Sequence, residues 1–387
     1  MLTNNINFKN FNLKQPKKKF IGLFRKLLEE NNEILKSLNN KYKDSYSKRT
    51  INKLKKYKEI LLIGIGGSIL GSRSIFSFLH HKIKKKFYFL SNFETPLLNS
   101  INQKKRLNLI ISKSGNTLET ISNSNILISN KTKNIFITEN KNSYLMTLAQ
   151  KLKSDVIHHN NFIGGRYSVL SEVGMLPAEL MGLNPKKFRR FNLLVKNKNF
   201  INTLVQNVSN SLYLVNKKKF NSIILNYDNS STGLFYWYQQ LIAESLGKKS
   251  KGILPIISNM PEDNHSLMQL YLDGTNNNFF TFFFVNDFLS KKIINDKLLK
   301  THYYLKNKNL NKIKYSQFFA TEKVFKKKNI PFRSFFIKKR NEETLGELFI
   351  FFILETILLG KAMNVNPYDQ PAVELIKSET KNFLLKS

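Results

Sequence analysis

Short apolar runs alternate with helical patterns along most of the chain. Residues 59–63 form such a run, which precedes a Gly-rich turn and a helical pattern that reaches residue 79. Residues 107–112 form another, followed by a small polar loop and a helical pattern over 118–128. This rhythm predicts an α/β fold in which mainly parallel strands are covered by helices on both faces. Further strands are predicted at 135–137, 156–157, 222–225, 253–257, 279–285 and 331–337.

The rhythm occurs twice, which indicates a loose internal duplication. Between the two α/β stretches lies a basic, polar region with a helical pattern and no strand signal. A long Lys-rich helical stretch is predicted over 289–329, and we interpret it as solvated. The predicted segments are a helical N-terminal segment (1–45), a first α/β domain (46–190), a helical connection (191–220), a second α/β domain (221–345) and C-terminal helices that complete the active site (346–387).

The charge of the chain is strongly basic but gives a weak indication of function. The 387 residues include 63 Lys+Arg and 26 Asp+Glu, for a formal net charge of +37. Only nine of the basic residues are Arg, the side chain that contacts phosphates and bases in a fork, and the short Lys runs are scattered. We therefore favour compositional drift on solvated faces over a nucleic-acid partner.

Several other classes are excluded or disfavoured. The absence of Cys excludes disulfides, a thiolate nucleophile and cysteine metal sites. The polar N-terminus has no apolar leader, which predicts a cytoplasmic location. The apolar run 348–359 is shorter than the ~20 residues of a membrane span and is interrupted by Glu355, so it predicts a buried core helix with a paired or functional Glu.

A glycine-rich loop follows the first strong strand. Four glycines lie within residues 64–71, and after a strand such a loop can turn backbone N–H groups toward an anion. Gly67 and Ser68 stand at the expected start of the following helix, where the hydroxyl could cap the helix or bind phosphate. The dinucleotide fingerprint fails because Ile69 occupies its third glycine position. A tight structural turn remains the alternative.

A hydroxyl-rich loop follows the second strand. Ser112, Lys113, Ser114 and Thr117 lie within six residues that also include Gly115. Hydroxyls at a helix N-terminus suit a dianionic phosphate without a metal, although Ser and Thr are also common helix caps. Two such loops after neighbouring strands favour a phosphate cradle.

Two further segments carry charged groups suited to catalysis. Arg166 follows two glycines and could stabilise negative charge on a substrate oxygen, or make an ordinary surface ion pair. Glu244 lies near the end of an apolar helix, on one face with Gln240. The helix dipole disfavours a carboxylate there, which predicts the raised basicity that a general base needs. The alternative is a structural ion pair of Glu244 with Lys248 or Lys249.

The last two segments are a histidine and a proline-rich turn. His265 stands where a helix is predicted to start and could transfer protons near neutral pH or cap that helix. Two prolines flank Gln370, and Lys377 follows two helical turns later. Alone, this segment would be a capped helix with a surface Lys. The His residues show no spacing typical of a metal site.

Taken in order, these six segments resemble the glucose-6-phosphate isomerase (phosphoglucose isomerase) family. The matching stretches are GIGGSILG, SKSGNTLET, GGRYS, QLIAESLGK, HSLMQLYLDG and NPYDQPAVELIK, from Gly64 to Lys377. The resemblance implies two SIS-type (sugar-isomerase) three-layer sandwich domains, a homodimer, and interconversion of glucose 6-phosphate and fructose 6-phosphate in glycolysis and gluconeogenesis. It implies no metal and no organic cofactor. The residues themselves predict no nucleic-acid partner, because no Arg-rich face is found, and no membrane partner, because the run 348–359 is short and charged.

The resemblance also implies roles, position by position. Gly67, Ser68, Ser112, Lys113, Ser114 and Thr117 match the phosphate-binding residues, and Gln240 and Gln370 match substrate contacts. Glu244 matches the base that moves a proton between C2 and C1 through a cis-enediol, and Arg166 matches the group that stabilises the enediolate. His265 and Lys377 match the residues that open the sugar ring, with the His donated across the dimer interface.

Two departures and two alternatives accompany this interpretation. Asn264 and Ala372 differ from the family's usual residues but lie outside the proton-transfer set. The alternatives are an isomerase that also accepts mannose 6-phosphate, and a regulator that binds sugar phosphate without turning it over. Simple binding would not require Glu244, His265, Arg166 and Lys377 together.

Overall fold

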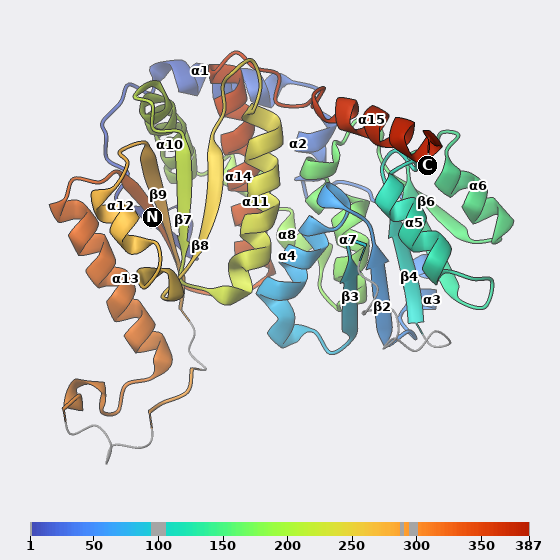
Figure 1. Cartoon of the computed structure of the whole chain (residues 1–387), viewed down its shortest axis with the longest axis horizontal. Helices are drawn as coiled ribbons and strands as arrows, with labels where there is room; N and C mark the ends of the chain where they lie inside the picture. The colour runs from blue at the N-terminus through green and yellow to red at the C-terminus, as the bar shows by residue number, and fades with distance from the viewer. Residues whose placement is uncertain (1, 94–105, 287–289, 294–300, 387) are drawn as a thin grey trace.

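A computed structural model describes residues 2–93, 106–286, 290–293 and 301–386 and contains two five-stranded sheets (Figure 1). All pairs in the first sheet are parallel. Its strand order is β3 (Lys86–Leu90), β2 (Glu59–Ile63), β4 (Arg106–Ile111), β5 (Lys133–Thr138) and β6 (Asp155–His158). The helices of this half are α3 (Lys48–Leu54), α4 (Leu70–Leu79), α5 (Leu118–Leu127), α6 (Tyr144–Lys151) and α7 (Glu172–Leu180).

The second sheet is parallel except for one edge strand. Its order is β1 (Ile6–Lys9), β10 (Phe332–Ile337), β9 (Asn278–Val285), β7 (Asn221–Asn226) and β8 (Leu254–Asn259), with β1 antiparallel to β10. Its helices are α10 (Lys198–Asn216), α11 (Thr232–Leu246), α12 (Met268–Asp273), α13 (Leu310–Lys327) and α14 (Glu342–Ala362). The remaining helices are α1 (Lys18–Glu29), α2 (Glu33–Ser37), α8 (Pro185–Phe188), α9 (Phe191–Leu194) and α15 (Val373–Lys386).

Four strands of each sheet share one topology. In each set the first strand, β2 or β7, is followed along the chain by a strand on one side and then by two strands on the other, giving the orders β3-β2-β4-β5 and β8-β7-β9-β10. The fifth strands differ, because β6 is parallel to its neighbour and β1 is antiparallel. The order therefore reverses between β2 and β4 in the first sheet and between β7 and β9 in the second. This repeat confirms the predicted duplication and the mainly parallel α/β fold class.

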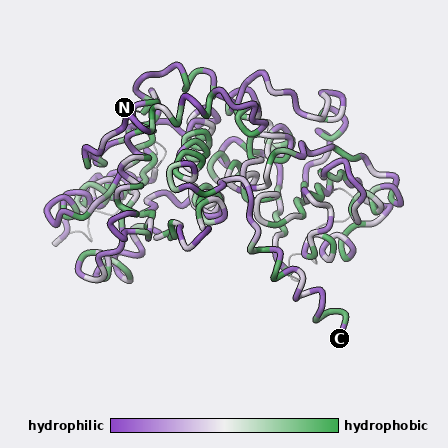
Figure 2. Tube along the Cα trace, turned by 90° about the horizontal axis from the view of Figure 1, so that it is seen from above, coloured by the Kyte–Doolittle hydropathy of each residue, from purple (hydrophilic) through white to green (hydrophobic). Residues whose placement is uncertain are grey.

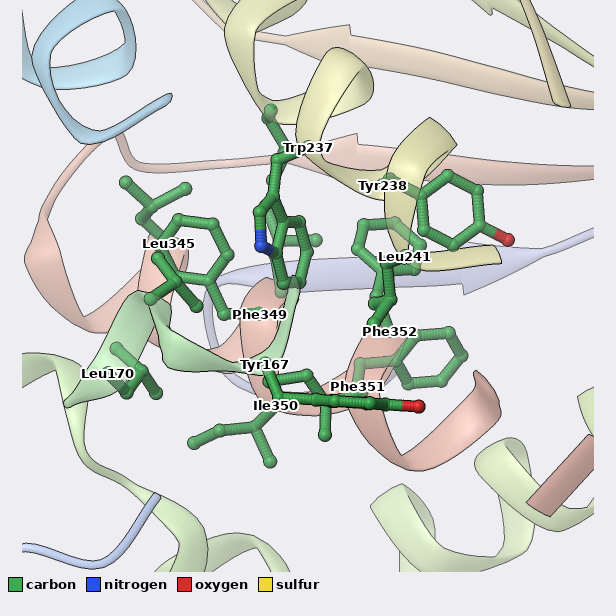
Figure 3. Packing of buried hydrophobic residues seen from close by; sticks show 14 of the residues in the cluster. Tyr167, Leu170, Trp237, Tyr238, Leu241, Leu345, Phe349, Ile350, Phe351 and Phe352 are labelled. Carbon is green, nitrogen blue, oxygen red and sulfur yellow. The ribbon is translucent and has the colours of Figure 1, made fainter. Parts of the chain in front are cut away.

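The core is built around α14, which is buried on all sides from Thr344 to Gly360. Figure 3 shows aromatic side chains of α14 and α11 packed together, with the rings of Trp237 and Phe349 centred 4.8 Å apart. Glu355 is buried on α14 and pairs with Arg333 of β10. This confirms the predicted core helix with a paired Glu. No helix in the described part of the chain is long and apolar enough to cross a membrane.

Three local predictions need correction. Residues 6–9 form β1 within the segment predicted to be helical, because an edge strand of four residues is too short to show a period. The sequence interpretation also missed β3. The helix predicted over 289–329 begins only at residue 310. Residues 301–309 contain a short 3-10 helix (Tyr303–Leu305) and a turn, and 289 and 294–300 lie outside the described residues.

Candidate functional site

The candidate site lies where the order of the first sheet reverses. The glycine-rich loop follows β2 and the hydroxyl-rich loop follows β4, and these two strands are parallel neighbours. Their carboxyl ends therefore meet at one edge of the sheet, the position at which open α/β sheets commonly bind ligands. A Cβ placed on Gly64 would lie 2.8 Å from the carbonyl oxygen of Ile111, so the two loops start in contact.

The glycine-rich loop packs tightly against two other segments. Gly66 adopts φ +55°, the left-handed region that favours glycine, and a Cβ there would lie 2.8 Å from Nε2 of Gln240. A Cβ on Gly67 would lie 2.2 Å from the carbonyl carbon of Gly165. These glycines let the loop contact both the Arg166 segment and α11. The loop is therefore a tight turn and also part of the candidate site.

The hydroxyl-rich loop gathers its side chains in one place. The hydroxyl oxygens of Ser112 and Thr117 are 2.8 Å apart, and those of Ser114 and Thr117 are 3.4 Å apart. Thr117 is the N-cap residue of α5, yet its side chain makes no capping hydrogen bond. Helix capping therefore does not explain the Thr117 hydroxyl, which lies beside the free N–H groups of the helix terminus.

Lys113 of the same loop is paired within the chain. Its Nζ lies 3.3 Å from Oε1 of Glu139, whose side chain is almost fully buried at the end of β5. The backbone N–H of Glu139 also donates to the carbonyl of Lys113 at 3.1 Å. The sequence interpretation missed Glu139; its position directly after a parallel strand was the available signal.

Arg166 connects three segments of the chain. Its side chain is 2% exposed, and hydrogen bonds engage all five of its N–H groups. Nε donates to Ser245, Nη1 to Glu244 and Gln370, and Nη2 to the carbonyls of Pro367 and Asp369. This arrangement excludes the ordinary surface ion pair that the sequence left open.

Glu244 is held at both carboxylate oxygens. Gln240 Nε2 donates to Oε1 at 2.8 Å and Arg166 Nη1 donates to Oε2 at 3.3 Å, while the Glu244 side chain keeps 26% exposure. The carboxylate is thus oriented and still accessible. Oε1 of Gln240 is buried without a hydrogen-bond partner. A buried acceptor without a partner beside an accessible carboxylate suggests a site that a ligand completes.

The alternative partner for Glu244 is engaged elsewhere. Lys248 pairs with Asp369 at 2.8 Å, and its hydrogen bond lowers the pKa of the Asp369 carboxyl. Together with Arg166, this contact holds the turn that carries Gln370 against the end of α11.

His265 and Lys377 do not join this cluster within one chain. Glu244 lies at the end of α11, and the chain then returns along β8, whose six residues span about 20 Å before the segment that carries His265. His265 is exposed there. Lys377 lies on α15, is 58% exposed and pairs with Glu374 on the same helix. Figure 2 shows the C-terminal end of the chain projecting from the body of the molecule.

A cavity of about 510 Å³ adjoins the cluster. Its lining includes Lys113, Gly164, Tyr167, Tyr368 and residues 30–34. Burial raises the pKa of both tyrosine hydroxyls, which therefore stay protonated, and the Tyr167 hydroxyl donates to the carbonyl oxygen of Pro367. A larger cavity of about 960 Å³ lies between α3 and β6, and none of the catalytic candidates lines it. We therefore assign the candidate site to the smaller cavity, because the charged and hydroxyl side chains gather beside it.

Among the described residues, no three His, Asp or Glu side chains converge to hold a metal ion.

Comparison with known proteins identifies a family for most of the chain. The model for "Phosphoglucose isomerase" matches residues 29–386. A probable glucose-6-phosphate isomerase of Methanococcus maripaludis is 32% identical over 348 residues, which cover 83% of this chain and 77% of that protein.

Solved structures show the same fold. A hypothetical protein of Thermus thermophilus superposes with a TM-score of 0.85 at 21% identity, covering 98% of this chain and 99% of the other. A glucose-6-phosphate isomerase of Chlamydia trachomatis superposes with a TM-score of 0.74 at 17% identity, covering 87% of this chain and 71% of the other. The SIS-type fold class, with helical segments at both termini, is confirmed.

Proposed function

The chain belongs to the phosphoglucose isomerase family and is an aldose–ketose isomerase, and from that premise we propose that it interconverts glucose 6-phosphate and fructose 6-phosphate in the cytoplasm, within glycolysis and gluconeogenesis. One observation carries the proposal. Glu244 is an accessible carboxylate held by Gln240 and by a buried, fully engaged Arg166, beside a hydroxyl-rich loop at the switch point of the first sheet.

The phosphate group binds at the two loops. The hydroxyls of Ser112, Ser114 and Thr117, together with the N-terminus of α5, supply donors for a dianion, and Gly67 and Ser68 complete the cradle. Lys113 leaves Glu139 and pairs with the incoming phosphate.

Proton transfer takes place at Glu244. Its carboxylate takes the proton from C2 of the open-chain aldose, and the C–H electron pair forms the double bond between C1 and C2 as the carbonyl oxygen gains charge. The positive charge of Arg166 stabilises the charge on O1. Return of the proton from Glu244 to C1, with transfer of the O2 hydroxyl proton to O1, turns C2–O into the carbonyl and gives the ketose. Oε1 of Gln240 accepts from a substrate hydroxyl, and the carboxamide of Gln370, held through its oxygen by Arg166, donates to another.

Ring opening requires groups that this chain alone does not bring to Glu244. We assign it to His265 of a second copy in a homodimer and to Lys377, after α15 moves toward the site. The exposure of His265, and its separation from Glu244 by the length of β8, support donation between subunits.

The first test measures turnover of fructose 6-phosphate with EDTA present, coupling the glucose 6-phosphate formed to a dehydrogenase. Robust activity that collapses in Glu244→Gln is expected. A folded protein that binds the sugar phosphate without turnover would instead be a non-catalytic relative. Running the assay from mannose 6-phosphate tests the broader specificity.

The second test uses mixed dimers of Glu244→Gln and His265→Gln chains. If His265 acts in the partner's site, each mixed dimer holds one site with both groups intact, and an equal mixture recovers about a quarter of the wild-type activity. Absence of recovery in verified mixed dimers would place both groups in the site of one chain.

A further inference from the structure

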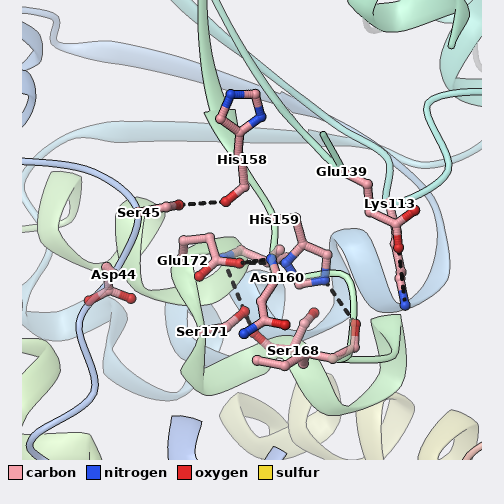
Figure 4. Close-up of polar contacts among 12 residues, drawn as sticks. Asp44, Ser45, Lys113, Glu139, His158, His159, Asn160, Ser168, Ser171 and Glu172 are labelled. Carbon is pink, nitrogen blue, oxygen red and sulfur yellow. Dashed lines mark hydrogen bonds and ion pairs between the residues drawn. The ribbon is translucent and has the colours of Figure 1, made fainter. Parts of the chain in front are cut away.

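A buried His–Glu pair lies behind the Arg166 segment. His159 follows β6 and Glu172 opens α7, and both side chains are 1% exposed. Nδ1 of His159 is 2.5 Å from Oε1 of Glu172, and Nε2 is 3.0 Å from the carbonyl oxygen of Ile163. Figure 4 shows the imidazole of His159 beside the carboxylate of Glu172. None of the roles proposed above uses either side chain.

The partners of His159 define its protonation. A backbone carbonyl can only accept, so Nε2 carries a proton. Oε1 of Glu172 already accepts from the N–H of Asn160 at 2.9 Å, and the Tyr42 hydroxyl donates to Oε2 at 3.2 Å. An ionised Glu172 carboxylate accepts all three of these contacts; with Glu172 ionised, Nδ1 also donates and the imidazole is a cation.

The pKa of Glu172 agrees with this assignment. Burial alone would raise it, but the hydrogen bond and positive charge of His159, with the N–H of Asn160, lower it below the ordinary value.

The other ionisable groups nearby are Tyr42, Asp44, Arg189 and Glu33. The carboxylate of Asp44 is taken by Arg189, and Glu33 accepts from the side chain of Asn160. Glu172 contacts this polar cluster through Tyr42, and His159 contacts the loop that leads to Arg166 through Ile163. The His159–Glu172 pair therefore connects the cluster to that loop.

The pair closes both ends of that loop. The loop runs from His159 to Glu172, which is the first residue of α7. Within the loop, the His159 ring also hydrogen-bonds the carbonyl of Ile163, directly before Gly164 and Gly165. Glycine pairs leave the backbone free to adopt many conformations, so Arg166 needs a fixed point upstream. Only two residues separate Ile163 from Arg166.

We propose that the buried His159–Glu172 ion pair is a positioning device that fixes the Gly164–Arg166 segment for catalysis. The proposal rests on the proposed function in assigning a catalytic benefit to Arg166. The charged state of the pair does not depend on that function, and it can be tested separately.

The charge is tested by NMR on the wild-type protein labelled with ¹⁵N in histidine. Comparison with the spectrum of His159→Gln identifies the signals. Two protonated-type ring nitrogens for His159 at pH 8 are expected. A neutral imidazole at His159 would overturn the ion pair even if the enzyme were fully active.

The positioning role is tested by kinetics of His159→Gln, with His158→Gln as a matched neighbour. The Gln amide has a single donor nitrogen, whereas the His ring has two on opposite sides, so Gln cannot bridge Glu172 and Ile163 as the ring does. We expect kcat to fall by about tenfold or more while KM changes by less than about threefold, because the phosphate loop is untouched. His158→Gln should match the wild type.

Circular dichroism, run at the assay temperature, separates positioning from unfolding. A loss of kcat that only follows the unfolded fraction would overturn the proposal, as would unchanged kcat in folded His159→Gln. Should that variant not fold, Glu172→Gln keeps the loop ends hydrogen-bonded without the charge, and the same split between kcat and KM applies to it. A fructose 6-phosphate assay that fails in the wild type, with the NMR signature present, would remove the proposed function and leave the ion pair.

Discussion

Four strands of each sheet follow the same order, yet among the residues that the structure describes only the first switch point presents a place for an anion. Between β2 and β4 the loops supply glycines and clustered hydroxyls. At the corresponding end of β7 lies Asp228, a buried carboxylate that pairs with Arg340 at 2.7 Å and also accepts from Ser231. The second position is thus already occupied by a negative charge. Topology creates the place, and local side chains decide whether a ligand can use it.

The sharpest test of this difference is the acid at the first site. Glu244→Gln keeps the size of the side chain but replaces one of its two acceptor oxygens by a donor and removes the proposed base, so kcat should fall about 10²–10⁴-fold. Steady-state kinetics of fructose 6-phosphate turnover measure it, with Gln239→Glu on the same helix as a folding control. Unchanged kcat in Glu244→Gln would place the base elsewhere.

The phosphate cradle comes next. Replacing Thr117 by Val removes the hydroxyl at the centre of the cluster, and a hydrogen bond to a charged group contributes about 1.5–3 kcal/mol, so KM should rise about 10–100-fold with little change in kcat. Ser231→Ala is the matched change at the second switch point and should leave KM unchanged. A rise in KM for Ser231→Ala would mean that both switch points bind substrate.

At the second switch point the expected effect is on stability. Asp228→Asn leaves Arg340 without its carboxylate and should lower the free energy of unfolding by about 1–3 kcal/mol, less than for a fully buried pair because Arg340 is partly exposed. Urea denaturation measures the change. The kcat/KM of the folded fraction should equal that of the wild type; a selective loss of catalysis would contradict a purely structural role.

The buried pair of the first half adds a pH dependence. Because the pKa of Glu172 is lowered in the folded protein from 4.5, its stabilisation is fully present above that ordinary value and is lost as the pH falls through the folded value. The Tm of the wild type should therefore exceed that of Glu172→Gln near pH 7 and approach it in acid. A Tm difference that stays constant across this range would contradict the lowered pKa.

The smallest effect concerns the acid beside the cradle. Glu139→Gln removes the competitor that holds Lys113 away from phosphate, so KM should fall about two- to fivefold, since partly exposed pairs contribute up to about 1 kcal/mol. Lys133, on the same strand, pairs with Asp155 in a similar way, and Asp155→Asn provides the control. A raised KM in Glu139→Gln would show that Glu139 orients Lys113 for binding.

The amino-acid sequence by itself determined the α/β class, the repeat and the two loops after adjacent strands, since these depend on period, glycine placement and residue type within a few positions. The burial of the helix that carries Glu355 followed from the same local pattern, whereas the structure decided between a paired and a functional Glu by placing Arg333 beside it. Residues 6–9 and 86–90 were too short or too mixed to show a period, and only their pairing with neighbouring strands reveals them as strands.

Only the tertiary structure decided which groups meet. Arg166 contacts residues about 80 and 200 positions away, and nothing in its local sequence predicts that all of its donors are engaged. Nor does local sequence predict that Glu139 pairs with Lys113, or that His159 contacts both Glu172 and Ile163. Contacts of this kind depend on how strands and helices that are distant in the chain pack together, and the local spacing of residues does not predict that packing.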